Sequence, residues 1–163
     1  MPHMRGHAPR RSEPGALSAE ELIELAVGLS GGFVCTHAIP LSTGVDLVAV
    51  AIRLALVETP TAEELVPRCA RAVAQRHLFP APGRVIAVEG AAEAAGGEGI
   101  ALLEVRVRPG QRVWPMTSHV TRGGVVIAVG DTRQQAVERA EAAAARVRII
   151  TQPETTSMSV AVH

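Results

Sequence analysis

The chain has 163 residues, a formal net charge of zero and an apolar content of 47%. The apolar content is typical of a protein with a folded core, while the neutral charge removes the usual electrostatic case for binding nucleic acid or an anionic membrane. With two Phe, one Trp and no Tyr, the chain also lacks the stacking side chains that binders of single-stranded nucleic acid use. We therefore expect neither nucleic acid nor a membrane as a partner.

Cysteine content and hydropathy favour a cytoplasmic protein. Cys35 and Cys69 are too few for a disulfide framework. The sequence contains no run of about 20 apolar residues, so no membrane-spanning helix is predicted. The basic N-terminus is not followed directly by the apolar stretch of a secretory signal.

The first third of the chain predicts a tail and two helices. Residues 1–17 are rich in Pro, Gly, Arg and His without periodicity, which is typical of a disordered tail. A capping box of Ser18 and Glu21 begins a predicted helix over 18–29. A second helix is predicted over 45–58. Because this segment is apolar nearly all round, we expect it to be a buried central helix.

A third helix is predicted from Thr61, which forms another capping box with Glu64. This helix is expected to end before Pro80, because proline disfavours helix at the residue that precedes it. Its apolar face would consist of side chains at helical spacing, namely Leu65, Val66, Cys69, Ala70, Val73 and His77.

Beyond residue 82 the pattern changes to short apolar runs bounded by glycine and proline, which indicates strands. Strands are predicted over 84–89, 100–107, 112–116, 124–129 and 148–151. One helical turn is predicted over 91–95, and a longer helix is expected to begin at a cap on Asp131 and to end near Val147. Helices followed by grouped strands favour an α+β domain over 18–151, with a flexible tail over 152–163.

Some residue types of a metal or nucleophilic site occur without the matching spacing. Cys35, His37, Cys69 and His77 include zinc-ligand types, but their spacing fits no standard zinc pattern. No nucleophile-elbow sequence accompanies the serines. We therefore expect neither zinc binding nor triad chemistry.

Short sequence pieces occur in a characteristic order between about residues 22 and 151. They are 24–32 (ELAVGLSGG), 39–48 (IPLSTGVDLV), 76–80 (RHLFP), 82–85 (PGRV), 109–110 (PG), 117–119 (TSH), 122–125 (RGGV) and 130–132 (GDT). In this order they resemble the C-terminal part of the ATP-grasp carboxylate–amine ligases, in the branch that includes dipeptide-forming enzymes and relatives of carbamoyl-phosphate synthase.

The resemblance implies an α+β, ATP-grasp C-terminal subdomain with N-terminal helices, a small, mostly antiparallel sheet and a C-terminal helix. The complete enzymes use Mg-ATP to phosphorylate a carboxylate, and an amine then attacks the acyl phosphate. Most of their ATP-binding residues precede the matching segment. We therefore expect a partial ligase domain that is inactive alone and has no complete cofactor site. Its nucleotide lobe would come from a partner chain, or the chain is a truncated piece of a complete enzyme. The alternative is a non-catalytic binding or oligomerisation module, including a homo-oligomer, that kept the fold.

The resemblance also implies candidate site residues. Glu24 matches a Mg²⁺ ligand, while Gly28 stands where the family has a phosphate-binding arginine, whose bidentate fork glycine cannot supply. Ser30, Gly31 and Gly32 match a turn near the phosphates and are candidate cofactor contacts. The alternative for Glu24 is an ordinary glutamate on a helix surface, and the alternative for the two glycines is an ordinary tight turn.

One more polar group stands out in the strand region. Ser118, His119 and Arg122 lie close together in sequence between two predicted strands. In a complete enzyme they would face the substrate, and the alternative is that they cap a turn.

Overall fold

The computed structural model describes residues 29, 31–115 and 122–153. The chain divides into a unit of Met1–Ser30 and a unit of Gly31–His163, and every helix and strand given below belongs to the second unit. The tail predicted over 1–17 and the helix predicted over 18–29, apart from Leu29, lie outside the described residues.

The second unit begins with three short helical segments. A π-helical turn, η1 (Val34–Ala38), continues into α1 (Ile39–Thr43), which ends at Gly44 in the left-handed conformation that glycine adopts readily. Helix α2 (Leu47–Ala55) begins at Asp46, whose carboxylate accepts hydrogen bonds from two amide groups of the first turn at 3.0 and 3.1 Å. This side chain thereby satisfies amides that the helix itself leaves unpaired.

Helix α2 confirms that the predicted second helix exists, but the expectation that it is buried is wrong. No residue of α2 is buried, and the side chains of Ile52 and Leu54 are 56% and 57% exposed. An apolar sequence indicates that a helix tends to be covered, but it does not identify what covers it. Among the described residues, α2 contacts η1, and this contact leaves its side chains at most half-buried.

The third predicted helix is wrong beyond its first turn. The capping box of Thr61 and Glu64 is present, but it begins only the short 3₁₀ turn η2 (Ala62–Leu65). The C-terminal part of the predicted helix is instead strand β1 (Ala72–Leu78). Pro67 disfavours continuation of the helix, and β1 pairs with a neighbouring strand along its whole length.

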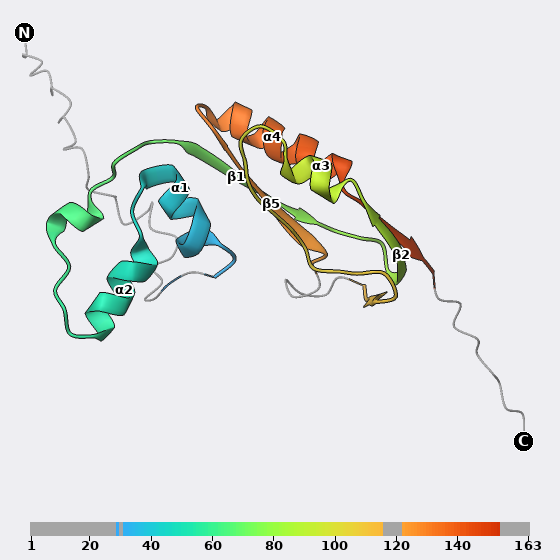
Figure 1. The fold of residues 1–163 in the computed structure, drawn as a ribbon, viewed down its shortest axis with the longest axis horizontal. Coiled ribbons are helices and arrows are strands. Elements are labelled where there is room, and N and C mark those ends of the chain that lie inside the picture. The colour runs from blue at the N-terminus through green and yellow to red at the C-terminus, as the bar shows by residue number, and fades with distance from the viewer. Residues whose placement is uncertain (1–28, 30, 116–121, 154–163) are drawn as a thin grey trace, which may run out of the picture. The chain divides into compact units, whose positions relative to one another are not determined.

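One antiparallel sheet has the strand order β1–β5–β3. Its central strand β5 (Gly124–Gly130) pairs with β1 on one side and with β3 (Ile100–Val105) on the other, which explains why β5 is almost entirely buried. Helix α4 (Arg133–Arg146) packs across β1 and β5, and α3 (Ala91–Ala95) packs on β3 and α4 (Figure 1).

Small side chains form the core between this sheet and its helices. One buried cluster consists of Ala74, Ala128, Ala136 and Ala140, and another consists of Leu78, Ala94, Val126 and Ala143. Because the helix meets the sheet through alanines, it lies close to the strands. A Cβ at Gly130 would stand 2.7 Å from the Ala136 amide nitrogen.

A second antiparallel sheet has the order β4–β2–β6. Its central strand β2 (Gly83–Glu89) pairs with the short β4 (Arg112–Val113) and with β6 (Arg148–Gln152). The α+β class with antiparallel strands and a C-terminal helix is confirmed. The strands form two three-stranded sheets, however, where one small sheet was expected.

The cap of α4 differs from the prediction by one position. The Thr132 hydroxyl accepts a hydrogen bond from the Gln135 amide at 3.2 Å, so Thr132 is the N-cap and Asp131 precedes it. Among the residues that the structure describes, no helix is both long enough and apolar enough to cross a membrane.

Candidate functional site

Most of the site that the sequence predicts lies outside the described residues, including Glu24, Gly28 and Ser30. Gly31 and Gly32 are described and form an exposed turn before η1, with Gly32 at a φ of 66°. A Cβ at either glycine would meet no atom within 4 Å, so no described group approaches the turn closely. The metal role of Glu24 and the cofactor role of the Ser30, Gly31 and Gly32 turn remain predictions.

A small hollow of about 180 Å³ lies where β3 ends and β5 begins, next to β4. We name it the arginine hollow. It is lined by Arg106, Gln111, Arg112, Trp114 and Arg122, together with two valines.

The backbone of Gly123 positions the cationic groups of this hollow. Its N–H donates to the carbonyl oxygen of Leu78 at 2.8 Å, and its carbonyl oxygen accepts from the N–H of Arg106 at 2.8 Å. These two hydrogen bonds continue the sheet beyond the regular ladder. They hold Arg122 between the end of β1 and the residue that follows β3.

Close contacts exclude side chains at the two glycines that follow Arg122. A Cβ at Gly123 would stand 2.5 Å from the Pro80 ring, and a Cβ at Gly124 would stand 2.3 Å from the carbonyl oxygen of Glu104. Real Cβ atoms do not approach other atoms so closely. The Gly123-Gly124 pair therefore allows the three strands of the first sheet to come together beside the arginine hollow.

His77, in β1, lies beside Arg122. Its Nε2 atom is 2.8 Å from Arg122 Nη1 and 3.1 Å from Gln75 Nε2. Because a guanidinium can only donate, the imidazole nitrogen accepts and the ring is neutral in this contact. Burial lowers the pKa of His77, and the charges of Arg122 and Arg106 lower it further, against a hydrogen bond with the Gly124 backbone that raises it.

The charges around the arginine hollow are unevenly matched. Arg106 pairs with the carboxylate of Glu104 at 3.1 Å, and the Arg112 guanidinium lies 3.8 Å from the centroid of the Trp114 ring. Arg122, by contrast, contacts the neutral imidazole of His77, and no carboxylate in the described ranges pairs with it. A guanidinium in this situation is suited to binding an anion.

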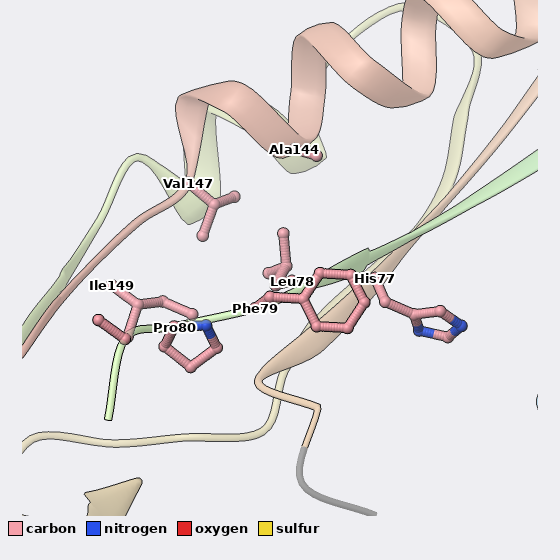
Figure 2. Close-up of a pocket in the computed structure, with 8 residues that line it drawn as sticks. His77, Leu78, Phe79, Pro80, Ala144, Val147 and Ile149 are labelled. Carbon is pink, nitrogen blue, oxygen red and sulfur yellow. The ribbon is translucent and has the colours of Figure 1, made fainter. Parts of the chain in front are cut away.

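A second hollow of about 380 Å³, lined by His77 and otherwise by apolar residues, lies where α4 ends and β6 begins. Figure 2 shows Leu78, Val147 and Ile149 gathered around this hollow. The His77 ring points away from Val147 and Ile149. Phe79, which also lines it, is 59% exposed. This hollow offers apolar contact and no charged group, so it has no evident chemistry of its own.

Of the polar group predicted from the sequence (Ser118, His119 and Arg122), the structure describes only Arg122. Ser118 and His119 lie outside the described residues, and the described partner of Arg122 is His77, which the sequence had placed on the apolar face of a helix. Sequence reasoning missed Arg106 and Trp114. The one available signal was the concentration of arginines between residues 104 and 122. Across the described ranges, no group of three His, Cys, Asp or Glu side chains could hold a metal ion.

Residues 76–152 match the family model of the L-amino acid ligase C-terminal domain 2. The matched segment runs from within β1 to the end of β6, so it includes the strands and helices that surround the arginine hollow. No curated protein matches the chain significantly in sequence.

Two solved structures share the fold. An L-amino acid ligase from Bacillus licheniformis has a TM-score of 0.62 at 17% identity, over 75% of this chain and 32% of that one. A phosphoribosylglycinamide synthetase from Anaerococcus prevotii has a TM-score of 0.61 at 12% identity, over 70% of this chain and 29% of that one. The chain thus spans less than a third of each structure that it matches.

Proposed function

Since the chain is related to the ATP-grasp amide-forming ligases and carries a C-terminal domain of theirs over residues 76–152, we propose that it serves as the C-terminal part of such a ligase. It acts only together with the domains that bind the nucleotide. One observation supports this most strongly: the shared fold covers at least 70% of this chain but less than a third of either ligase structure.

The reaction that we propose for the assembled enzyme joins a carboxylate and an amine through an acyl phosphate, with Mg-ATP as the phosphate donor. Such chemistry depends on charge neutralisation and on positioning of the phosphates. Magnesium is usually held by only one or two carboxylates together with the phosphates of the nucleotide. In this proposal other domains bind the nucleotide and most of the magnesium shell, and the assembled enzyme is cytoplasmic.

Reconstitution tests this function. The chain is mixed with a separate chain that contains the nucleotide-binding domains of an ATP-grasp ligase, and ADP release is measured with a mixture of amino acids. We expect ADP release that depends on both chains and on the amino acids. If the second chain releases ADP equally well without this one, the proposed function is wrong.

Glu24 is the residue of this chain that we propose to contact the magnesium ion in the assembled enzyme. In the reconstituted mixture, Glu24→Gln is expected to reduce ADP release about tenfold or more, because an amide is a much poorer ligand for this cation than a carboxylate. Glu21→Gln removes the same charge three positions away and serves as the matched control. Equal effects of the two substitutions on ADP release would contradict a role for Glu24 in magnesium binding.

A second candidate function is a non-catalytic binding or oligomerisation module. The exposure of Ile52, Leu54 and Leu56 (56%, 57% and 66%) favours it, because a run of exposed large apolar side chains often marks an interaction site. Sedimentation of the chain alone and with its partner separates the two functions. A stable homo-oligomer that does not bind the ATP-grasp chain would favour the non-catalytic module.

A further inference from the structure

We propose that the arginine hollow binds a phosphate group, which the guanidinium groups of Arg106 and Arg122 hold beside His77. This inference goes beyond the ligase function and does not depend on it, because it requires only residues of this chain. Four observations support it: the local charge, the size of the hollow, its fixed backbone and the environment of His77.

The local charge favours an anion. Arg106 and Arg122 contribute two guanidinium groups to the hollow, and Glu104 is the carboxylate that pairs with one of them. The pair of Arg106 and Glu104 is weak, because both side chains are more than 40% exposed. Arg122 meets a neutral imidazole. In a chain whose formal net charge is zero, this small hollow therefore has an excess of positive charge.

The size and the charge together favour phosphate. A volume of about 180 Å³ is below the roughly 300–1,000 Å³ of pockets that enclose a drug-sized ligand. The hollow therefore fits a single small group, such as the phosphate of a larger molecule or free phosphate. A phosphate dianion carries twice the charge of a carboxylate, so two guanidinium groups attract it more strongly.

The backbone beneath the hollow is fixed before any ligand binds. The two hydrogen bonds of Gly123 tie the residue after Arg122 to both neighbouring strands. Because the surrounding strands already hold the two arginine backbones, binding costs little ordering of the main chain.

The pKa of His77 is sensitive to the charge in this hollow. The charged groups near it are Arg122 and Arg106, both of which lower its pKa. Gln75 and the Gly124 backbone complete the polar contacts of its ring. An anion between the two guanidinium groups opposes their charge, so the pKa of His77 rises when phosphate binds. By the same coupling, phosphate binds more tightly when His77 is protonated.

NMR titration of the full chain with inorganic phosphate tests the proposal. The His77 ring signals, assigned by comparison with His77→Gln, are followed against phosphate, acetate and chloride at matched ionic strength. We expect a saturable shift with phosphate, a much weaker response to acetate and none to chloride. A phosphomonoester such as glycerol phosphate, titrated in parallel, shows whether a phosphate carried on a larger molecule binds more tightly than free phosphate.

Variants make the test specific to the arginines. Arg122→Gln is expected to weaken phosphate binding about tenfold or more, which corresponds to the loss of one charge-assisted hydrogen bond. Arg133→Gln removes the same charge at the start of α4, away from the hollow, and should bind phosphate as the parent does. Arg122→Lys keeps the charge and should retain part of the affinity.

Three outcomes would overturn the proposal. They are a response to acetate as strong as that to phosphate, a response to phosphate no greater than that to chloride, and unchanged phosphate affinity in a folded Arg122→Gln chain. None of these outcomes depends on ATP or on a second chain, so the result stands apart from the test of the ligase function.

Discussion

Gly123 and Gly124 follow Arg122 at the point where three strands converge, and close contacts require glycine at both positions. A Cβ at Gly124 would stand 2.3 Å from the backbone oxygen of Glu104, which cannot move without disturbing β3. The sequence alone marks these glycines only as a break between two apolar runs. The atoms that exclude a side chain belong to Pro80 and Glu104, which lie 43 and 20 positions before Gly123 and Gly124 in the chain.

Gly124→Ala is therefore expected to lower the free energy of unfolding by about 1–3 kcal/mol or more, because the new methyl group forces strands β3 and β5 apart. Gly96→Ala is the control. A Cβ at Gly96 would be 3.7 Å from its nearest neighbour, which is an ordinary contact. Urea denaturation of both variants measures the difference, and equal stabilities would mean that the strands do not approach as described.

His77 gives the protein a dependence of stability on pH. Burial and the two arginines lower its pKa in the folded chain below its ordinary value of 6.5. The unfolded chain therefore binds a proton more readily, and the free energy of unfolding falls as the pH drops from above 6.5 towards the folded pKa. Arg122→Gln removes one cause of the lowered pKa and should lessen this fall.

The measurement is urea denaturation at about pH 7.5 and about pH 5.5, on either side of the ordinary pKa. Parent, Arg122→Gln and His77→Gln chains are compared. We expect the loss of stability at the lower pH to be largest in the parent and smallest in His77→Gln. The same loss in all three chains would show that the imidazole is not held neutral.

At the scale of the elements, the sequence predicted correctly those helices and strands whose ends are set by nearby residues. The strands at 84–89 and 124–129 and the helical turn at 91–95 are short segments that glycine or proline bounds, and each appears close to its predicted place. Strand β1 was missed because its residues have helical spacing as well as strand spacing. Its pairing with β5, more than 45 positions further along the chain, decides the outcome.

The cap of α4 is a local feature that the sequence placed one residue too early. Thr132→Ala is expected to cost about 1 kcal/mol, because the hydroxyl accepts from the Gln135 amide. Asp131→Ala should cost only a few tenths of a kcal/mol, since its charge merely lies near the positive end of the helix. Thermal unfolding measures the stability of the two variants. A larger loss of stability for Asp131→Ala would show that Asp131 is the N-cap, as the sequence predicted.

The candidate site was less predictable than the fold. Arg122 stood out in the sequence, but its contact with His77 joins residues 45 positions apart. Arg106 enters the hollow because Gly123 bonds to its backbone. Such neighbours follow from strand pairing, which a single sequence does not reveal. The residues that the family resemblance named, Glu24 and Ser30, lie outside the described residues.

At the scale of the whole molecule, a neutral chain of 163 residues contains an α+β core over its last half and an apolar helix, α2, in which no residue is fully buried. The core matches the C-terminal domain 2 of the L-amino acid ligases. Both ligase structures that share the fold are more than three times as long as the shared part. These proportions support the proposal that the chain is one part of a larger ligase.

ADP formation by the purified 163-residue chain alone, with Mg²⁺, ATP and a mixture of amino acids, tests this function most directly. We predict no ADP above the buffer blank at any chain concentration. Steady ADP formation that co-elutes with the chain on gel filtration and rises in proportion to its concentration would contradict the proposal, because the chain would then contain its own nucleotide site.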